Sequence, residues 1–301
     1  ALIDVVMETD SAGLQLIKNI RNKLKNKTTR IVIRTGQPGQ APEREIIREY
    51  EITDYKNKTE LSGLKLDTLL CSTLRAYQKI IALNKNQMGL ELVIESSSVL
   101  SNSQTYESLI TETTKYLTTL VKQNHHNSMS PLSSLGFYCN KNVFNLFDAR
   151  GNLSEISGLT DVESIPDAAS MLISQSIAEQ RHIYTDNQFV LNMQSKADSC
   201  IIFYFEGFND LNQQDIALLE LFASNTKTIF DNNELRQELE QGQREIVYLL
   251  GEAVEEKSEE TGNHIRRVAE VTRILALELG YSETDSEKKK SASPLHDLGK
   301  I

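Results

Sequence analysis

The chain has 301 residues, 42 acidic against 32 basic, and a formal net charge of −10 at pH 7. Its hydrophobic fraction of 39% and charged fraction of 25% are typical of a soluble globular protein and argue against a disordered chain. The acidic balance argues against a protein that coats nucleic acid or an anionic membrane through its overall charge, so neither DNA nor a membrane is expected as a partner.

Cysteine usage and the two ends of the sequence indicate the setting of the protein. Cys71, Cys139 and Cys200 are far apart and lack CxxC spacing, which favours a reduced, cytoplasmic environment. No apolar run in the sequence reaches the roughly 18 residues that a membrane-spanning helix needs. Both ends fall within apolar stretches, so we expect the sequence to be a fragment of a longer protein.

Strand and helix signals alternate over residues 1–62. Apolar residues at helical spacing over 14–24 predict a helix, and a second helix is expected to begin at Pro42. The predicted strands, rich in apolar and β-branched residues, cover residues 1–6, 30–34 and 52–55. Strands separated by helices pair in parallel, so this region is expected to be part of a doubly wound α/β sheet.

Polar side chains stand at the ends of these predicted strands. Asp4 closes the first strand, Thr35 ends the second and Lys58 follows the third. The carboxyl ends of parallel strands are where doubly wound sheets bind ligands. An acceptor, a hydroxyl and a cation gathered there would form a compact phosphoryl site, whereas each residue taken alone would be an ordinary surface side chain.

With Met7 and Gly13 in the following loop, these residues resemble the second half of a response-regulator receiver domain. The resemblance implies that Asp4 is the phosphoacceptor and that Thr35 and Lys58 are the switch residues. It also implies a sensor histidine kinase as partner and Mg²⁺ as cofactor in the intact protein.

The sequence departs from the receiver pattern at specific positions. Glu8 and Thr59 stand where proline is usual in that family. The acidic pair that binds Mg²⁺ in receivers would precede residue 1. We therefore expect the chain as given not to be phosphorylated normally, whereas the intact parent could be.

The middle of the chain is expected to be an α+β unit. Residues 63–84 predict one helix, and further helical patterns cover 88–100, 106–121 and 215–230. Short strands are expected at 135–139, 143–147, 189–193 and 200–205, with Gly151-Asn152 as a hairpin turn. Helices flanking an antiparallel sheet resemble, faintly, the GAF-like sensor domain of uncharacterised type found between receiver and HD-GYP domains.

Histidines and cysteines in this middle region carry no assigned ligand. His125-His126 could bind a metal, but the neighbouring Asn and Ser residues favour a solvated loop. His182 and Cys139 are expected to be structural.

A charged helical segment follows the middle region. Leu235, Leu239 and Ile246 recur at roughly heptad spacing, and Gly242 interrupts the same stripe. The stripe predicts a connecting helix, which either forms a short parallel coiled coil in a homodimer or packs on its own domain. The dimer is the favoured interpretation.

The last segment carries the residues with the most distinctive chemistry. His264 opens an amphipathic helix that Gly280 is expected to end, a charged loop is expected up to Lys290, and His296-Asp297 follow. Neutral imidazole and carboxylate together suit Fe, Mn or Zn, and a metal-activated water is the nucleophile in phosphoester hydrolysis. Glu260 would share a helix face with His264, and Lys300 suits a phosphate oxygen.

The strings Glu260-Thr261-Gly262-Asn263-His264-Ile265-Arg266-Arg267-Val268 and His296-Asp297-Leu298-Gly299-Lys300-Ile301 together resemble the start of an HD-GYP domain, the cyclic di-GMP phosphodiesterase branch of the HD hydrolases. The resemblance implies a helical bundle in which Glu260, His264, His296 and Asp297 hold divalent transition metals. It gives Asp297 and Lys300 the catalytic roles, with Lys300 on the phosphate. The downstream ligands of that family would lie beyond Ile301.

The chain is therefore expected to combine α/β, α+β and all-α parts: a partial receiver sheet, a GAF-like middle domain and the beginning of a helical HD bundle. The expected boundaries are 1–62, a connecting helix over 63–85, 86–232, a linker helix over 233–258, and 259–301. The predicted function is a two-component response regulator that hydrolyses cyclic di-GMP under aspartyl phosphorylation, the fragment itself being inactive. The alternative is a non-catalytic signalling scaffold with a degenerate HD domain and a ligand- or partner-binding middle domain.

Overall fold

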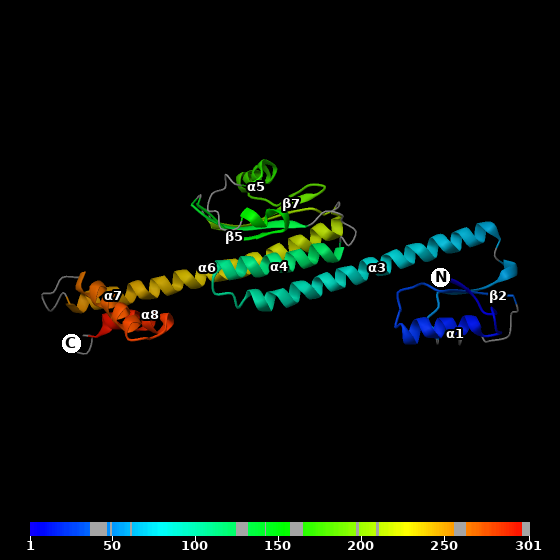
Figure 1. Ribbon diagram of the computed structural model, residues 1–301, viewed down its shortest axis with the longest axis horizontal. Helices are drawn as coiled ribbons and strands as arrows, with labels where there is room; N and C mark the ends of the chain where they lie inside the picture. The colour runs from blue at the N-terminus through cyan, green and yellow to red at the C-terminus, as the bar shows by residue number, and fades with distance from the viewer. Residues whose placement is uncertain are drawn as a thin grey trace.

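The structure is a computed structural model. The molecule is elongated (Figure 1). It describes residues 1–36, 47–48, 50–60, 62–124, 132–141, 143–156, 165–196, 199–208, 211–255 and 263–296. A small α/β unit lies at one end, an α+β unit in the middle, and a cluster of helices at the other end. The long helices α3 (Gly63–Leu100) and α6 (Gln213–Glu255) join the three parts. Within the described ranges, no helix is both long and apolar enough to cross a membrane.

The N-terminal unit is a parallel sheet, as the sequence predicted. Its strands are β1 (Leu2–Asp4), β2 (Val32–Thr35) and β3 (Asp54–Asn57), in the order β1-β2-β3. Helix α1 (Ala12–Lys18), the π-helical turn η1 (Asn19–Lys23) and the short η2 (Lys58–Glu60) complete it. The buried residues of its core are Ile3, Val5, Ile17, Ile31, Ile33 and Ile52. The helix predicted from Pro42 lies outside the described residues, apart from helical Ile47 and Arg48.

One continuous helix leads from this unit into the middle of the molecule. Helix α3 runs from Gly63 to Leu100. The prediction of separate helices over 63–84 and 88–100 is therefore wrong. The intervening Lys85-Asn86-Gln87 contains neither proline nor glycine, so nothing in it stops a helix.

The middle unit is an antiparallel sheet of five strands in the order β5-β4-β8-β7-β6. Its strands are β4 (Ser133–Asn140), β5 (Val143–Arg150), β6 (Ile183–Tyr184), β7 (Gln188–Lys196) and β8 (Ser199–Glu206). Helices α3, α4 (Tyr106–Asn124) and α6 (Gln213–Glu255) cover one face, and α5 (Asp167–Glu179) and η3 (Gly151–Ile156) the other (Figure 1). The α+β class is confirmed.

Two local predictions in the middle unit are wrong. Gly151-Asn152 does not turn a hairpin, because Gly151, at φ 68°, begins η3 after β5 has ended. The antiparallel pair formed by β4 and β5 turns earlier in the chain, since β4 ends at Asn140 and β5 begins at Val143. The helix expected over 215–230 and the connecting helix after 233 are one helix, α6, because Asp231-Asn232-Asn233 between them contains neither proline nor glycine to end it.

The C-terminal cluster consists of α7 (Asn263–Glu278), α8 (Glu283–Ala292) and η6 (Ser293–Leu295). The amphipathic helix and its stop at Gly280, which has φ 81°, are confirmed. The charged loop expected before Lys290 is wrong, because this stretch is α8. The Ser282 side chain accepts a hydrogen bond from the Asp285 backbone N–H at 3.1 Å and caps this helix.

Candidate functional site

The N-terminal sheet brings two of its three predicted site residues into direct contact. Asp4 ends β1, and Lys58 follows β3 directly. The Lys58 Nζ lies 3.0 Å from Asp4 Oδ2. Thr35, buried, ends β2 between them. The strand ends therefore gather a carboxylate, a hydroxyl and a cation at one edge of the sheet, in the arrangement that the sequence predicted.

A second cation at this edge was missed by sequence reasoning. The Arg34 guanidinium forms a bidentate interaction with the Asp4 carboxylate: Nε donates to Oδ1 at 2.7 Å and Nη2 donates to Oδ2 at 3.2 Å. The parallel register sets Asp4 opposite Arg34, which is the signal that could have found it. The hydrogen bond from Arg34 is the main cause that lowers the pKa of Asp4 to about 2. Burial opposes it, and the Lys58 hydrogen bond and the two positive charges lower the pKa further. The carboxylate is thus held ionised.

Helix α1 begins directly against the end of β1. A Cβ added to Gly13 would lie 1.8 Å from the Asp4 carbonyl oxygen, so only glycine fits there. The Gly13 N–H donates to the Val5 carbonyl at 3.0 Å. This close approach ties the loop after Asp4 to the strand that carries the carboxylate.

The C-terminal candidate residues are described in part. His264 is half-buried near the start of α7, and His296 is exposed just after η6. Glu260, Asp297 and Lys300 lie outside the described residues, as do His125 and His126. Among the residues whose positions are described, no group of three or more His, Cys, Asp or Glu side chains is placed to hold a metal ion.

The hydrogen bonding of His296 fits a metal ligand. Its Nδ1 lies 2.9 Å from the Ser293 carbonyl oxygen, and since a carbonyl only accepts, Nδ1 must carry the proton. With Nδ1 as the donor, Nε2 is the ring nitrogen that can act as a metal ligand. A metal-ligating histidine typically donates its other N–H to a carbonyl or carboxylate in this way. With imidazole and carboxylate as its donors, the predicted set suits a divalent transition metal.

Gly251 of α6 lets the two histidine-bearing segments meet. A Cβ on Gly251 would lie 2.7 Å from Ile265 Cδ1 and 2.8 Å from the Pro294 carbonyl oxygen. Ile265 adjoins His264, and Pro294 precedes His296 by two residues. The buried Gly251 thus joins the start of α7 to η6 against one helix. The sequence analysis missed this glycine.

Replacing Gly251 by alanine is expected to destabilise the C-terminal cluster by about 1–3 kcal/mol, because the Pro294 backbone oxygen cannot move aside as a side chain can. Gly242→Ala on the same helix is the matched control. Nothing lies within 4 Å of a Cβ there, so removing the glycine should stabilise the helix by up to about 1 kcal/mol. Hydrogen exchange of the α7 amides measures the first effect, and exchange of the α6 amides measures the second. Equal effects of the two substitutions would contradict the close packing at Gly251.

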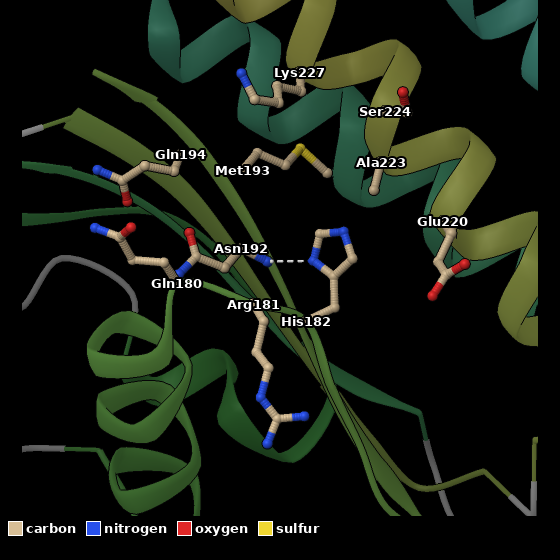
Figure 2. A pocket seen from close by; sticks show the side chains of 10 residues that line it. All are labelled: Gln180, Arg181, His182, Asn192, Met193, Gln194, Glu220, Ala223, Ser224 and Lys227. Atoms are coloured by element: carbon tan, nitrogen blue, oxygen red, sulfur yellow. Dashed lines mark hydrogen bonds between the residues drawn. The ribbon is translucent and has the colours of Figure 1, made fainter. Parts of the chain in front are cut away.

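A cleft of about 360 Å³ lies between β7, residues 180–182 and α6 (Figure 2). His182 stands at its centre, and its Nδ1 accepts a hydrogen bond from the Asn192 backbone N–H at 3.0 Å. Burial lowers the pKa of His182, so the ring is neutral with its proton on Nε2. Glu220 and Lys227 reach the cleft from α6. The volume and the mixed polar lining would suit a small polar ligand.

The middle region of the chain identifies the family to which it belongs. A family model described as a domain of unknown function, DUF3369, matches residues 70–239, more than half of the 301 residues. The chain belongs to the DUF3369 family. The DUF3369 region begins within α3, includes the whole antiparallel sheet and ends within α6. The cleft around His182 lies inside it.

Curated relatives match outside the DUF3369 region as well. The chain is 36% identical over 309 aligned residues to the 3'3'-cGAMP-specific phosphodiesterase 2 of Vibrio cholerae, an alignment that covers 100% of this chain and 58% of that protein. It is 36% identical over 64 residues to the cyclic di-GMP phosphodiesterase response regulator RpfG of Xanthomonas campestris, covering 21% of this chain and 17% of RpfG. The chain thus spans little more than half the length of the Vibrio relative.

Proposed function

We propose that this DUF3369 chain is part of a metal-dependent cyclic dinucleotide phosphodiesterase of the HD-GYP type, controlled by phosphorylation of Asp4. The observation that carries the proposal is the 36% identity to a cyclic dinucleotide phosphodiesterase along the whole chain. The histidine-bearing segments that meet at Gly251 support it independently. Cyclic di-GMP is the first candidate substrate, and the Vibrio relative favours 3'3'-cGAMP as the second.

In this proposal His264, His296 and Asp297 hold divalent metal ions, with Glu260 as a further ligand. Metal ions bound there would supply an activated water and neutralise charge on the phosphodiester. The Ser293 carbonyl orients His296 through Nδ1, so that Nε2 serves as the ligand atom. Lys300 binds a phosphate oxygen of the substrate, and Asp297 acts as ligand and catalytic group.

The proposed control acts through the ion pairs of Asp4. In the unphosphorylated chain, Arg34 and Lys58 both neutralise its carboxylate. Phosphorylation by a sensor histidine kinase would add negative charge and three acceptor oxygens at this place, for which the two cations and Thr35 are the nearby partners. In the intact protein, Mg²⁺ would complete the site, as the receiver resemblance implies. The rearrangement would be passed along α3, which begins three residues after η2.

Turnover by the intact protein tests the proposal. We expect the protein loaded with Mn²⁺ or Fe²⁺ to convert cyclic di-GMP to linear dinucleotide or GMP, and chelation followed by metal return to remove and restore the activity. Chromatography of the products measures the conversion, and a parallel assay with 3'3'-cGAMP ranks the two substrates. Bound metal without turnover of either substrate would contradict the enzyme and favour the non-catalytic scaffold.

A further inference from the structure

The second half of α6 is a solvent-exposed helix with an apolar stripe. From Leu235 to Leu250 no residue of this helix is buried. Large apolar side chains nevertheless recur on it, with Leu239 67% and Leu249 64% exposed. A helix that exposes an apolar stripe in water is stabilised by packing that stripe against a partner.

The stripe has the spacing of a coiled-coil seam. Its positions alternate in steps of four and three residues: Leu235, Leu239, Gly242, Ile246, Leu249 and Ala253. In heptad terms, Leu239 and Ile246 occupy a positions, and Leu235 and Leu249 occupy d positions. All four of these side chains are more than half exposed. The structure thereby answers the question that the sequence left open, since this stretch does not pack on its own domain within the described residues.

The opposite face of the same helix makes the contacts within the chain. Gly251 meets Ile265 and Pro294 there, and the Arg266 guanidinium lies 5.3 Å from the centre of the Tyr248 ring. Because α7 and η6 pack on this side, they leave the stripe uncovered. No described part of this chain covers the stripe, so we look for its partner in another molecule.

The flanking charges favour one orientation of a second copy. Glu238, Glu245 and Glu252 occupy the g positions, whereas Arg236, Gln243 and Leu250 occupy the e positions. In an antiparallel pair, g faces g, and glutamates would face glutamates along the seam. In a parallel pair, g faces e, so that no like charges meet. The charge pattern therefore permits a parallel pair of identical helices and disfavours an antiparallel one.

The start of the stripe is rigidly tied to the middle unit. The buried Glu234 carboxylate accepts a hydrogen bond from Ser199 Oγ at 2.9 Å, and the Tyr106 hydroxyl donates to Gln237 Oε1 at 3.0 Å. These contacts fix the direction in which α6 leaves the antiparallel sheet. A seam formed beyond this point would hold two middle units and two C-terminal clusters in a defined relation.

We propose that residues 235–253 form a parallel two-stranded coiled coil with a second copy of this chain. The partner is the same helix in the same register, so Leu239 packs beside Leu239 and Leu249 beside Leu249 of the second copy. This inference does not depend on the proposed enzymatic function, because it rests only on the stripe, its exposure and its flanking charges.

Sedimentation of the full chain tests the interface. We expect a dimer for the wild type and at least a 100-fold weaker dimer for Leu239→Asp, which puts a charge into the seam. Gln241→Asp adds the same residue to the same helix outside the seam and should leave the dimer unchanged. A monomeric wild type at about 100 μM, or equal dimerisation of the two variants, would overturn the proposal.

Cysteine cross-linking tests the orientation with conservative changes. In a Cys71→Ser background, which removes the exposed native thiol, Leu239→Cys and Leu249→Cys chains are oxidised separately and as a mixture. In a parallel pair, each variant oxidised by itself forms a disulfide between the introduced cysteines of its two copies. An antiparallel pair would instead link position 239 to position 249 only in the mixture, and that result would overturn the parallel arrangement.

Discussion

His296→Ala is expected to lower cyclic dinucleotide turnover by the intact protein by more than about 100-fold. Loss of a supporting group around a metal already lowers affinity or activity by roughly 10–100-fold, and loss of the ligand itself should exceed that. The folded state should be unaffected within about 0.5 kcal/mol, because the His296 side chain is exposed. Metal content by mass spectrometry and product chromatography measure the effect.

His296→Asn is the matched control for the structural role of this ring. The asparagine amide can still donate to the Ser293 carbonyl in place of Nδ1, but it has no atom corresponding to Nε2. We therefore expect His296→Asn to lose metal and activity as completely as His296→Ala. Wild-type turnover in the asparagine variant would show that His296 only holds the backbone and would end its assignment as a ligand.

Arg21→Met is expected to destabilise the N-terminal sheet by about 3–5 kcal/mol, because four backbone carbonyls lose a charged donor. Arg21 is 7% exposed, and its guanidinium donates to four backbone carbonyls: Asn26 at 2.6 Å, Thr29 at 2.9 Å, Tyr50 at 3.0 Å and Glu51 at 3.1 Å. Methionine matches the length of the side chain but has no donor. The four carbonyls would lose these donors. Each carbonyl that stays buried without a new hydrogen bond costs about 1–3 kcal/mol.

Hydrogen exchange of the β1, β2 and β3 amides measures this loss, since a chain of several units does not unfold in one step. Lys23→Met is the control, because it removes the same charge from the same turn at an exposed position. It should change protection of the sheet by less than about 0.5 kcal/mol. If the two variants behaved alike, the Arg21 hydrogen bonds would contribute nothing measurable to the sheet.

Local sequence patterns predicted the strands and most helices correctly, and failed where helices continue. Alternating strands and helices gave the parallel order of β1, β2 and β3. The four strands predicted in the middle unit are present, and β6 is the one that the analysis missed. The breaks assigned within α3 and α6 were wrong because the polar residues at these points include no proline or glycine that would end a helix.

Some residues of the candidate sites could be found from the sequence, and others could not. Asp4, Thr35 and Lys58 could be found from the sequence because each stands at a strand end, and parallel strands bring those ends together. Arg34 could not be found without the register that sets it opposite Asp4. Glu260, Asp297 and Lys300 remain predictions from the HD-GYP resemblance.

The sequence by itself determined the periodicities: which segments are strands or helices, and which chemistry stands at their ends. These properties depend on neighbours within a few residues. Only the tertiary structure decided that Gly251 joins α7 to η6 and that the apolar stripe of α6 faces solvent. Both depend on contacts between residues far apart in the chain. The spacing of an apolar stripe is the same whether the helix packs on its own domain or exposes the stripe to solvent.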